Sequence, residues 1–194
     1  MSRSESDVAG KILDHAEALV RTQGYNAFSF REVAKAVGVK SATVHYYHPT
    51  KADLGAAVAR RYTDRFLKAL GDPAAGPAEA VAPLRRLHAL ASDALTRDGM
   101  MCLCGMLGAE IAGLPPAVAD EAAAFFRRTI DWTMAALAAR PWGRGRPEAE
   151  LRRVAVKTIA TLEGGMIIAR TMGDLSLFED LAADNPATEA GAGP

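Results

Sequence analysis

The amino-acid sequence predicts an all-α protein, and three observations support that fold class. Alanine is abundant while aromatic residues amount to only 6%, a composition that favours helices over sheets. Apolar residues recur at helical spacing along most of the 194 residues. Short breaks rich in glycine or proline separate these periodic stretches into several helices. The chain is long enough to form one or two small domains with a real core.

The first expected helix runs from about Ser6 to Thr22 and ends at Gly24. Its apolar residues fall on one stripe, which predicts a single buried face. This stripe consists of Val8, Ile12, Ala16, Leu19 and Val20. Tyr25 and Phe28 follow the helix, and we expect them to close a small core with it.

Two short helical segments follow, and a tight turn with glycine joins them. Ser29 and Glu32 have the spacing of a capping box, in which each side chain serves the backbone N–H of the other. Gly38 stands where the end of a helix needs a left-handed residue. The second segment, Lys40 to Tyr47, is too short to bury a face by itself. It carries outward-facing hydrogen-bond donors and aromatic rings instead.

A second capping pair, Thr50 with Asp53, begins a longer helix that runs to about Leu70. Its apolar residues share one side, so the helix suits a connecting rod between two parts of the chain. A helix, a glycine turn and a short polar second helix together describe a helix-turn-helix DNA reader. An ordinary helical hairpin at the surface of a bundle has the same spacing, so the residue types must decide.

The segment GYNAFSFREVAKAVGVKSATVHYYHPTKADL, with the helix before it, resembles the N-terminal domain of the TetR-type (tetracycline-repressor-like) transcription regulators. The resemblance covers about Ser6 to Arg65, and the total length also suits that family. It implies that the second helix of the motif enters the major groove and that the next helix begins on phosphates. It also implies a three-helix helix-turn-helix domain, joined by the connecting helix to a C-terminal helical ligand-binding and dimerisation domain.

Carried over position by position, the resemblance assigns DNA contacts to residues of the motif. Contacts at or near base edges fall to Lys40, Ser41, Ala42 and Thr43, phosphate contacts fall to Tyr46, Tyr47 and Lys51, and Ser29 and His45 complete the set. Two positions depart from the family pattern, since tyrosine is commonest at the position of His45 and a buried phenylalanine at that of His48. His45 can still bond a phosphate or a base. His48 puts a half-polar ring where the family has a core anchor.

The break from Gly71 to Pro77 predicts a domain boundary. The expected domains are 1–51, which holds the motif, and 72–183, which is helical, with the helix at 50–70 between them. The tail 184–194 is small, polar and acidic, and we expect it to be disordered. Within the second domain, the periodicity predicts helices at 80–97, 101–112, 117–140, 147–172 and 175–183.

The second domain is rich in soft, adaptable side chains, which suit a pocket for an apolar effector and equally suit an ordinary core. The resemblance implies such a pocket, whose occupation shifts the dimer to a shape that no longer matches the operator. The candidate lining residues are Met101, Cys104, Leu107, Trp132 and Met166.

The resemblance also implies a homodimer that pairs the last two long helices, here about 117–140 and 147–172. Gly164-Gly165 lies mid-helix, at a cost of about 1 kcal/mol per glycine relative to alanine. The close approach of another helix would offset that cost, either from a second subunit or from the same one. The candidate interface residues are Leu162, Gly164, Gly165 and Ala169.

Cys102 and Cys104 suggest a thiol switch or a metal site. A reactive thiol needs a lowered pKa and exposure, whereas this run is apolar. Zinc would need two further ligands nearby, and His88 alone does not supply them. Buried small side chains are the simpler interpretation, and we expect no metal and no cofactor.

The overall charge and the motif inventory give no sign of several function classes. Basic and acidic side chains both number 23, so the total charge does not indicate a polyanionic partner. The sequence lacks a Gly-rich phosphate loop after a strand, a G-x-S-x-G motif and an H-E-x-x-H motif, so nothing indicates an enzyme. The longest uncharged run, Gly99 to Ala109, is too short to span a bilayer. The N-terminus has no apolar signal region, so we expect a cytoplasmic protein without a membrane partner.

The sequence therefore predicts a ligand-responsive transcriptional repressor. It would bind a pseudo-palindromic operator in double-stranded DNA as a homodimer and be released by a small, largely apolar effector. Two alternatives stay open. One is a thiol- or electrophile-responsive regulator that acts through Cys102 and Cys104, and the other is a helical ligand-binding protein without specific DNA binding.

Overall fold

The computed structural model describes residues 3–76, 82–96 and 99–183. Within these ranges every regular element is a helix and none is a strand, which confirms the predicted all-α class. Contacts between residues divide the chain into two compact units. Unit 1 comprises Met1–Asp64 and Cys102–Phe125, and unit 2 comprises Arg65–Met101 and Phe126–Pro194.

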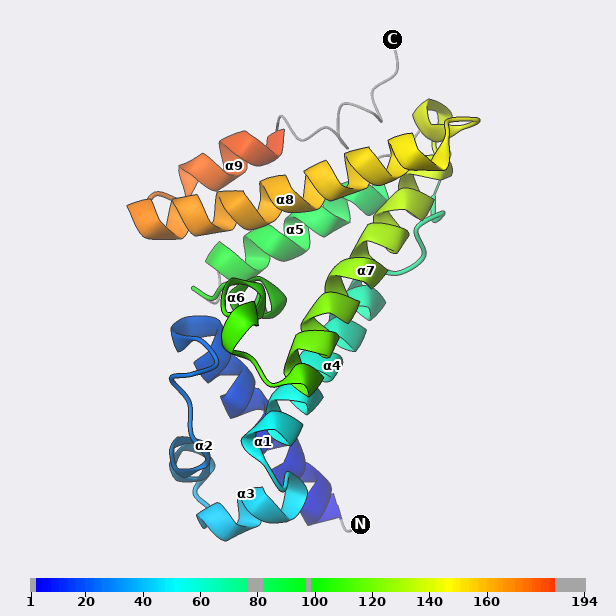
Figure 1. Cartoon of the computed structure of the whole chain (residues 1–194). Helices are drawn as coiled ribbons and strands as arrows, with labels where there is room; N and C mark the ends of the chain where they lie inside the picture. Colours follow the sequence, from blue (N-terminus) through cyan, green and yellow to red (C-terminus); the bar gives the residue numbers. More distant parts are fainter. Residues whose placement is uncertain (1–2, 77–81, 97–98, 184–194) are drawn as a thin grey trace. The chain divides into compact units, whose positions relative to one another are not determined.

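Unit 1 holds the N-terminal helices together with a later part of the chain. Its complete elements are α1 (Arg3–Gln23), α2 (Phe30–Val37), α3 (Ser41–Tyr47), α6 (Leu103–Ala109) and the 3-10 turn η1 (Ile111–Gly113). The unit also takes in most of α4 (Lys51–Leu70) and the beginning of α7 (Pro116–Ala138), so the division falls inside two long helices. Within this unit α2 packs against α1 and α3, and α6 packs against α1 (Figure 1).

The core of unit 1 forms around the stripe predicted for the first helix. Ile12, Ala16 and Val20 are buried there. Tyr25 and Phe28 are also buried, and their rings meet edge to face with centroids 5.5 Å apart. This confirms that the two aromatic residues close the small core, as their position after the helix indicated.

Unit 2 is built around a long helix near the C-terminal end of the chain. Its complete elements are α5 (Ala82–Thr96), the 3-10 turn η2 (Pro141–Gly143), α8 (Glu148–Met172) and α9 (Ser176–Ala183). In this unit α8 packs against both α9 and α5 (Figure 1). The indole N–H of Trp132 donates to the Gly71 carbonyl at 2.7 Å, so an α7 side chain holds the segment that follows α4.

One helix is shorter than its apolar pattern predicted. The sequence indicated a helix at 101–112, whereas α6 begins at Leu103 and ends at Ala109. Cys102 has non-helical backbone angles, φ −55° and ψ +128°, and it caps the helix, because its sulfur accepts the N–H of Gly105 at 3.4 Å. Met101 and Cys102 therefore lie outside the helix although both are buried.

The two adjacent glycines of α8 have different surroundings. A Cβ at Gly165 would lie 3.2 Å from the ring of Phe178, whereas a Cβ at Gly164 would meet nothing within 4 Å. Leu162 and Ala169 are buried within the chain, as Gly165 is. Of the four residues predicted for a dimer interface, Gly164 is thus the one with open space, and the interface stays a prediction. The tail predicted to be disordered, 184–194, lies outside the described residues, and the boundary at 72 stays a prediction.

Candidate nucleic-acid interface

The turn between α2 and α3 has the geometry that its glycine predicted. Gly38 adopts the left-handed conformation, with φ +77° and ψ +31°. The N–H of Val39 donates to the Ala34 carbonyl at 2.9 Å, which closes the end of α2. Val44 of α3 is fully buried, so this one side chain anchors the short helix to the rest of unit 1.

Both predicted capping pairs form, and one differs in detail. Thr50 and Asp53 make the complete box, since each backbone N–H donates to the side chain of the other at 2.9 and 3.1 Å. At the start of α2, the N–H of Glu32 donates to the hydroxyl of Ser29 at 3.3 Å. That hydroxyl donates in turn to the Glu32 carboxylate at 2.8 Å, so the carboxylate holds the Ser29 side chain. Ser29 therefore fixes the start of α2.

The residues predicted to contact DNA gather on α3 and at the beginning of α4. Lys40 is the extended residue that precedes α3, and it is exposed together with Ser41 and Ala42. Tyr46 is 77% exposed, far more than aromatic side chains usually are in a folded protein. Thr43 and Tyr47 are half-buried. The outer side of α3 thus presents hydroxyl, amine and phenol groups to solvent.

His45 is held by contacts within the protein. Its ring meets the ring of Phe30 at a centroid distance of 4.4 Å, and its Nδ1 lies 3.3 Å from the carbonyl oxygen of Pro49. The sequence did not indicate the contact with Phe30, because the two residues lie on different helices and only the glycine turn brings them together.

The ammonium of Lys51, the first residue of α4, lies over two aromatic rings. Its Nζ is 4.6 Å from the ring centroid of Tyr25 and 4.7 Å from that of Phe28, within the range of cation–π attraction. Burial lowers the pKa of the Lys51 ammonium, and the nearby carboxylates of Glu110 and Glu32 oppose that change. The two rings that close the core therefore hold the ammonium of Lys51, and its contact with phosphate stays a prediction.

His48 ends α3, and its backbone N–H donates to the Val44 carbonyl at 2.9 Å. The side chain is half-buried, at the position where the family commonly has phenylalanine. Burial lowers the pKa of His48, and the carboxylate of Asp53 opposes that shift. The site thus favours the neutral ring.

Replacing His48 by phenylalanine is expected to make unfolding less sensitive to acid. Because the folded pKa lies below the ordinary value of 6.5, the unfolded chain takes up the proton first as the pH falls. The wild-type protein should therefore lose stability from His48 below about pH 6.5, and the variant should not. Urea unfolding at pH 7 and pH 5 measures the difference, and parallel losses in both proteins would refute it.

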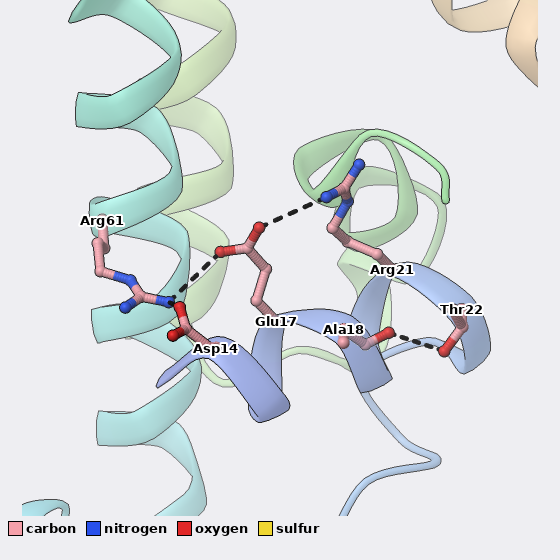
Figure 2. Close-up of polar contacts among 6 residues, drawn as sticks. All are labelled: Asp14, Glu17, Ala18, Arg21, Thr22 and Arg61. Carbon is pink, nitrogen blue, oxygen red and sulfur yellow. Dashed lines mark hydrogen bonds and ion pairs between the residues drawn. The ribbon is translucent and has the colours of Figure 1, made fainter. Parts of the chain in front are cut away.

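An ionic network joins α1 to α4, and its central pair, Glu17 and Arg21, is buried. Glu17 lies between two arginines (Figure 2), with Oε1 3.5 Å from Nη1 of Arg21 and Oε2 3.6 Å from Nη2 of Arg61. Arg61 also pairs with the exposed Asp14 at 2.7 Å. Arg21 lies over the ring of Tyr62, 5.7 Å from its centroid. The helix that begins with Lys51 is thereby tied to α1.

The residues predicted to line an effector pocket are all buried. Cys104 and Leu107 belong to unit 1, whereas Met101, Trp132 and Met166 belong to unit 2. The pocket stays a prediction.

Cys102 and Cys104 form no disulfide bond, and both side chains are buried. A reactive thiol needs exposure, so the structure adds no support for a thiol switch. Cys102 hydrogen-bonds to the phenol of Tyr62, and burial raises the pKa of that phenol well above 10.

Neither a metal-binding cluster nor a membrane-spanning helix occurs in residues 3–76, 82–96 and 99–183. No group of three or more His, Cys, Asp or Glu side chains in these ranges is placed to hold a metal ion. None of the helices in the same ranges combines the length and the apolar character that crossing a bilayer requires.

Comparisons with known proteins agree with this geometry. Residues 12–58, which include the whole motif, match the family described as bacterial regulatory proteins, tetR family. A TetR transcriptional regulator from Legionella pneumophila has a similar structure, with 31% identity and a TM-score of 0.83 over 92% of this chain and 95% of that chain. A TetR-family regulator from Agrobacterium tumefaciens is 26% identical with a TM-score of 0.82, again over 92% and 95%.

A third structure, the reduced form of E. coli NemR, has the same fold at 19% identity, with a TM-score of 0.73 over 93% of this chain and 96% of that chain. No protein of curated function matches the sequence. The likeness to the Legionella protein extends over nearly the whole of both chains, and the helix-turn-helix geometry agrees with it. The chain therefore belongs to the TetR family of DNA-binding transcriptional regulators, which are not enzymes.

Proposed function

We propose that the protein is a ligand-responsive repressor that binds a pseudo-palindromic operator as a homodimer. The observation that carries the proposal is the exposed polar side of α3 next to Lys51 at the start of α4. Lys40, Ser41, Ala42 and Thr43 would meet base edges, and Tyr46, Tyr47 and Lys51 would meet phosphates. As a regulator of transcription, the protein would act in the cytoplasm.

A dimer follows from the small size of the reading helix. Each good base contact contributes only about 1–3 kcal/mol of discrimination, and α3 has seven residues. Two copies of α3 in successive major grooves, one helical turn apart, would read enough base pairs to select a site.

An exposed apolar face of α8 supports that dimer. Ile167 and Ile168 are 51% and 48% exposed, and Val156 is also exposed. At 100° per residue, these side chains and Gly164 fall within an arc of about 120° on α8. This arc lies opposite the middle of the buried stripe, which runs through Ala155, Leu162 and Ala169. Exposed apolar side chains that gather on one helix face mark interaction surfaces. We therefore place the dimer contact on this face, with Gly164 allowing close approach and Leu162 and Ala169 supporting the helix from within.

A small, largely apolar effector would release the operator. The core of unit 2, which includes the buried Trp132 and Met166, is mostly apolar and suits such a molecule. To act, the effector must bind more tightly to the dimer shape that does not fit the operator, because equal affinity for both shapes shifts nothing.

The proposal is tested by DNA binding of the full chain. We expect the wild-type protein to shift a duplex from the region upstream of its own gene in the presence of excess unrelated DNA. Lys51→Ala should weaken binding roughly tenfold at all sequences and reduce the salt dependence by about one counterion, since one phosphate contact is lost. Lys68→Ala removes an exposed charge from the last turn of α4 and is the matched control. Full affinity in Lys51→Ala contradicts the phosphate role, and absence of selective binding by the wild type contradicts the function.

The dimer is tested separately by the mass of the particle in solution. Ile168→Asp is expected to convert the dimer to a monomer, because burial of an unpaired carboxylate in an apolar interface is unfavourable by several kcal/mol. Ile111→Asp changes an isoleucine of similar exposure in unit 1 and should leave the dimer intact. Light scattering after size-exclusion chromatography distinguishes the two states, and an unchanged dimer in Ile168→Asp would move the interface elsewhere.

A further inference from the structure

The end of α6 is attached to residues 24–28, which form the corner that follows α1. Glu110, the residue after α6, accepts three hydrogen bonds from that corner within unit 1. Its Oε1 accepts the N–H of Tyr25 at 3.0 Å, and its Oε2 accepts the N–H and the side-chain amide of Asn26 at 3.3 and 2.7 Å. A single carboxylate thus satisfies two backbone donors that no helix serves.

The corner is shaped to receive this carboxylate. Gly24 has φ +90°, which strains any residue with a Cβ, and a Cβ there would also collide with Oε1 of Glu110. Position 24 therefore requires glycine for two reasons: the left-handed backbone of the turn and the close approach of Glu110.

The same corner contains the two aromatic rings over which the Lys51 ammonium lies. The Tyr25 ring, whose backbone N–H is bound by Glu110, is one of the two rings under the Lys51 ammonium. Phe28, the other ring, meets Tyr25 edge to face. The Glu110 charge also acts on Lys51 directly, because it opposes the lowering of the ammonium pKa by burial. The contacts therefore run without interruption from the end of α6 through the corner to Lys51.

We infer that Glu110 is a positioning residue that couples the end of α6 to DNA binding by holding the corner on which Lys51 rests. The inference rests on the proposed phosphate role of Lys51. In this role Glu110 acts through the corner and not by contacting DNA. A displacement of α6 would move the corner and the ammonium with it. By reciprocity, phosphate bound at Lys51 must in turn stabilise the attachment of α6.

A carboxylate that only stabilised the fold would not produce this linkage, so the test measures the response of α6 to DNA. Hydrogen exchange of the full chain is followed at Tyr25, Asn26 and Leu103–Ala109, with and without the duplex bound in the gel-shift experiment. In the wild type the duplex should slow exchange at all of these amides. The reciprocal measurement is the affinity for the same duplex.

Glu110→Ala should break the coupling. Without DNA, exchange at Tyr25 and Asn26 should rise about tenfold, because each amide loses a charge-assisted hydrogen bond. Duplex affinity should fall about fivefold or more, and exchange in α6 should no longer respond to the duplex. Glu110→Gln keeps an acceptor oxygen and should recover part of both effects. The matched control is Glu121→Ala, which removes a carboxylate of the same unit that binds Nε of Arg60 at 2.8 Å.

The outcomes separate the coupling from the function. If Glu110→Ala binds the duplex as Glu121→Ala does, and α6 still responds, the coupling is refuted while DNA binding stands. If the wild type binds no duplex selectively, the proposed function fails and this inference fails with it. Should Glu110→Ala not fold, Asn26→Ala removes only the side-chain donor and should weaken both responses about twofold. An unchanged response in Asn26→Ala would then overturn the coupling.

Discussion

Glu17→Ala is expected to lower the free energy of unfolding by about 3–5 kcal/mol, because it removes one partner from a buried ion pair. The side chains of Glu17 and Arg21 are only 8% and 9% exposed. The variant would leave the Arg21 guanidinium largely out of water without the carboxylate at 3.5 Å. Arg61 would lose less, since it keeps Asp14 at 2.7 Å and is more exposed. Urea unfolding measures the change.

Two companion variants test the reason for that loss. Asp14→Ala removes an exposed carboxylate from the same network and should cost less than about 1 kcal/mol. The double change of Glu17 and Arg21 to methionine removes both buried charges at similar volume, and its stability should lie close to that of the wild type. Equal losses in Glu17→Ala and Asp14→Ala would show that burial of the pair is not the cause.

Phe178→Ala is expected to lower the stability of unit 2 by about 3–5 kcal/mol, the usual range for emptying a buried phenylalanine site. The side chain is 1% exposed and joins three helices of that unit. It stacks on the ring of His88 in α5 at 5.3 Å, and it covers Gly165 of α8. Without the ring, α9 would lose its main attachment.

The stability of Phe178→Ala is measured by urea unfolding followed by circular dichroism, and the docking of α9 by limited proteolysis near the C-terminus. Leu181→Ala is the control, because this side chain also approaches Gly165 from α9 but is 40% exposed. It should change stability by well under half as much. A cleavage pattern and stability like those of the control would refute the anchoring role of Phe178.

Local features of the motif were predictable because they depend on residues within a few positions of each other. The left-handed Gly38 and the capping pair of Thr50 and Asp53 are such features, and both form as expected. The pair of Ser29 and Glu32 is equally local, yet its carboxylate binds the hydroxyl. Spacing indicates that two side chains meet, whereas side-chain rotamers determine which atoms do.

The length of α6 was overestimated for a different reason. An apolar run has no contrast between an inner and an outer side, so it carries no signal for where a buried helix begins. Cys102 sets the beginning of the helix because its sulfur accepts the N–H of Gly105, a role that is seldom assigned to cysteine from sequence.

The sequence by itself determined the helical class, the order of the helices and the helix-turn-helix motif. These features follow from hydrophobic periodicity, caps and turns, which depend on residues that are close in the sequence. Only the tertiary structure decided which glycine of α8 is covered by α9, since Gly164 and Gly165 look alike in the sequence. It also decided that Glu110 holds a corner 85 positions earlier in the chain. A carboxylate that binds two backbone amides leaves no periodic trace, because its partners are chosen by the packing of α6 against α1.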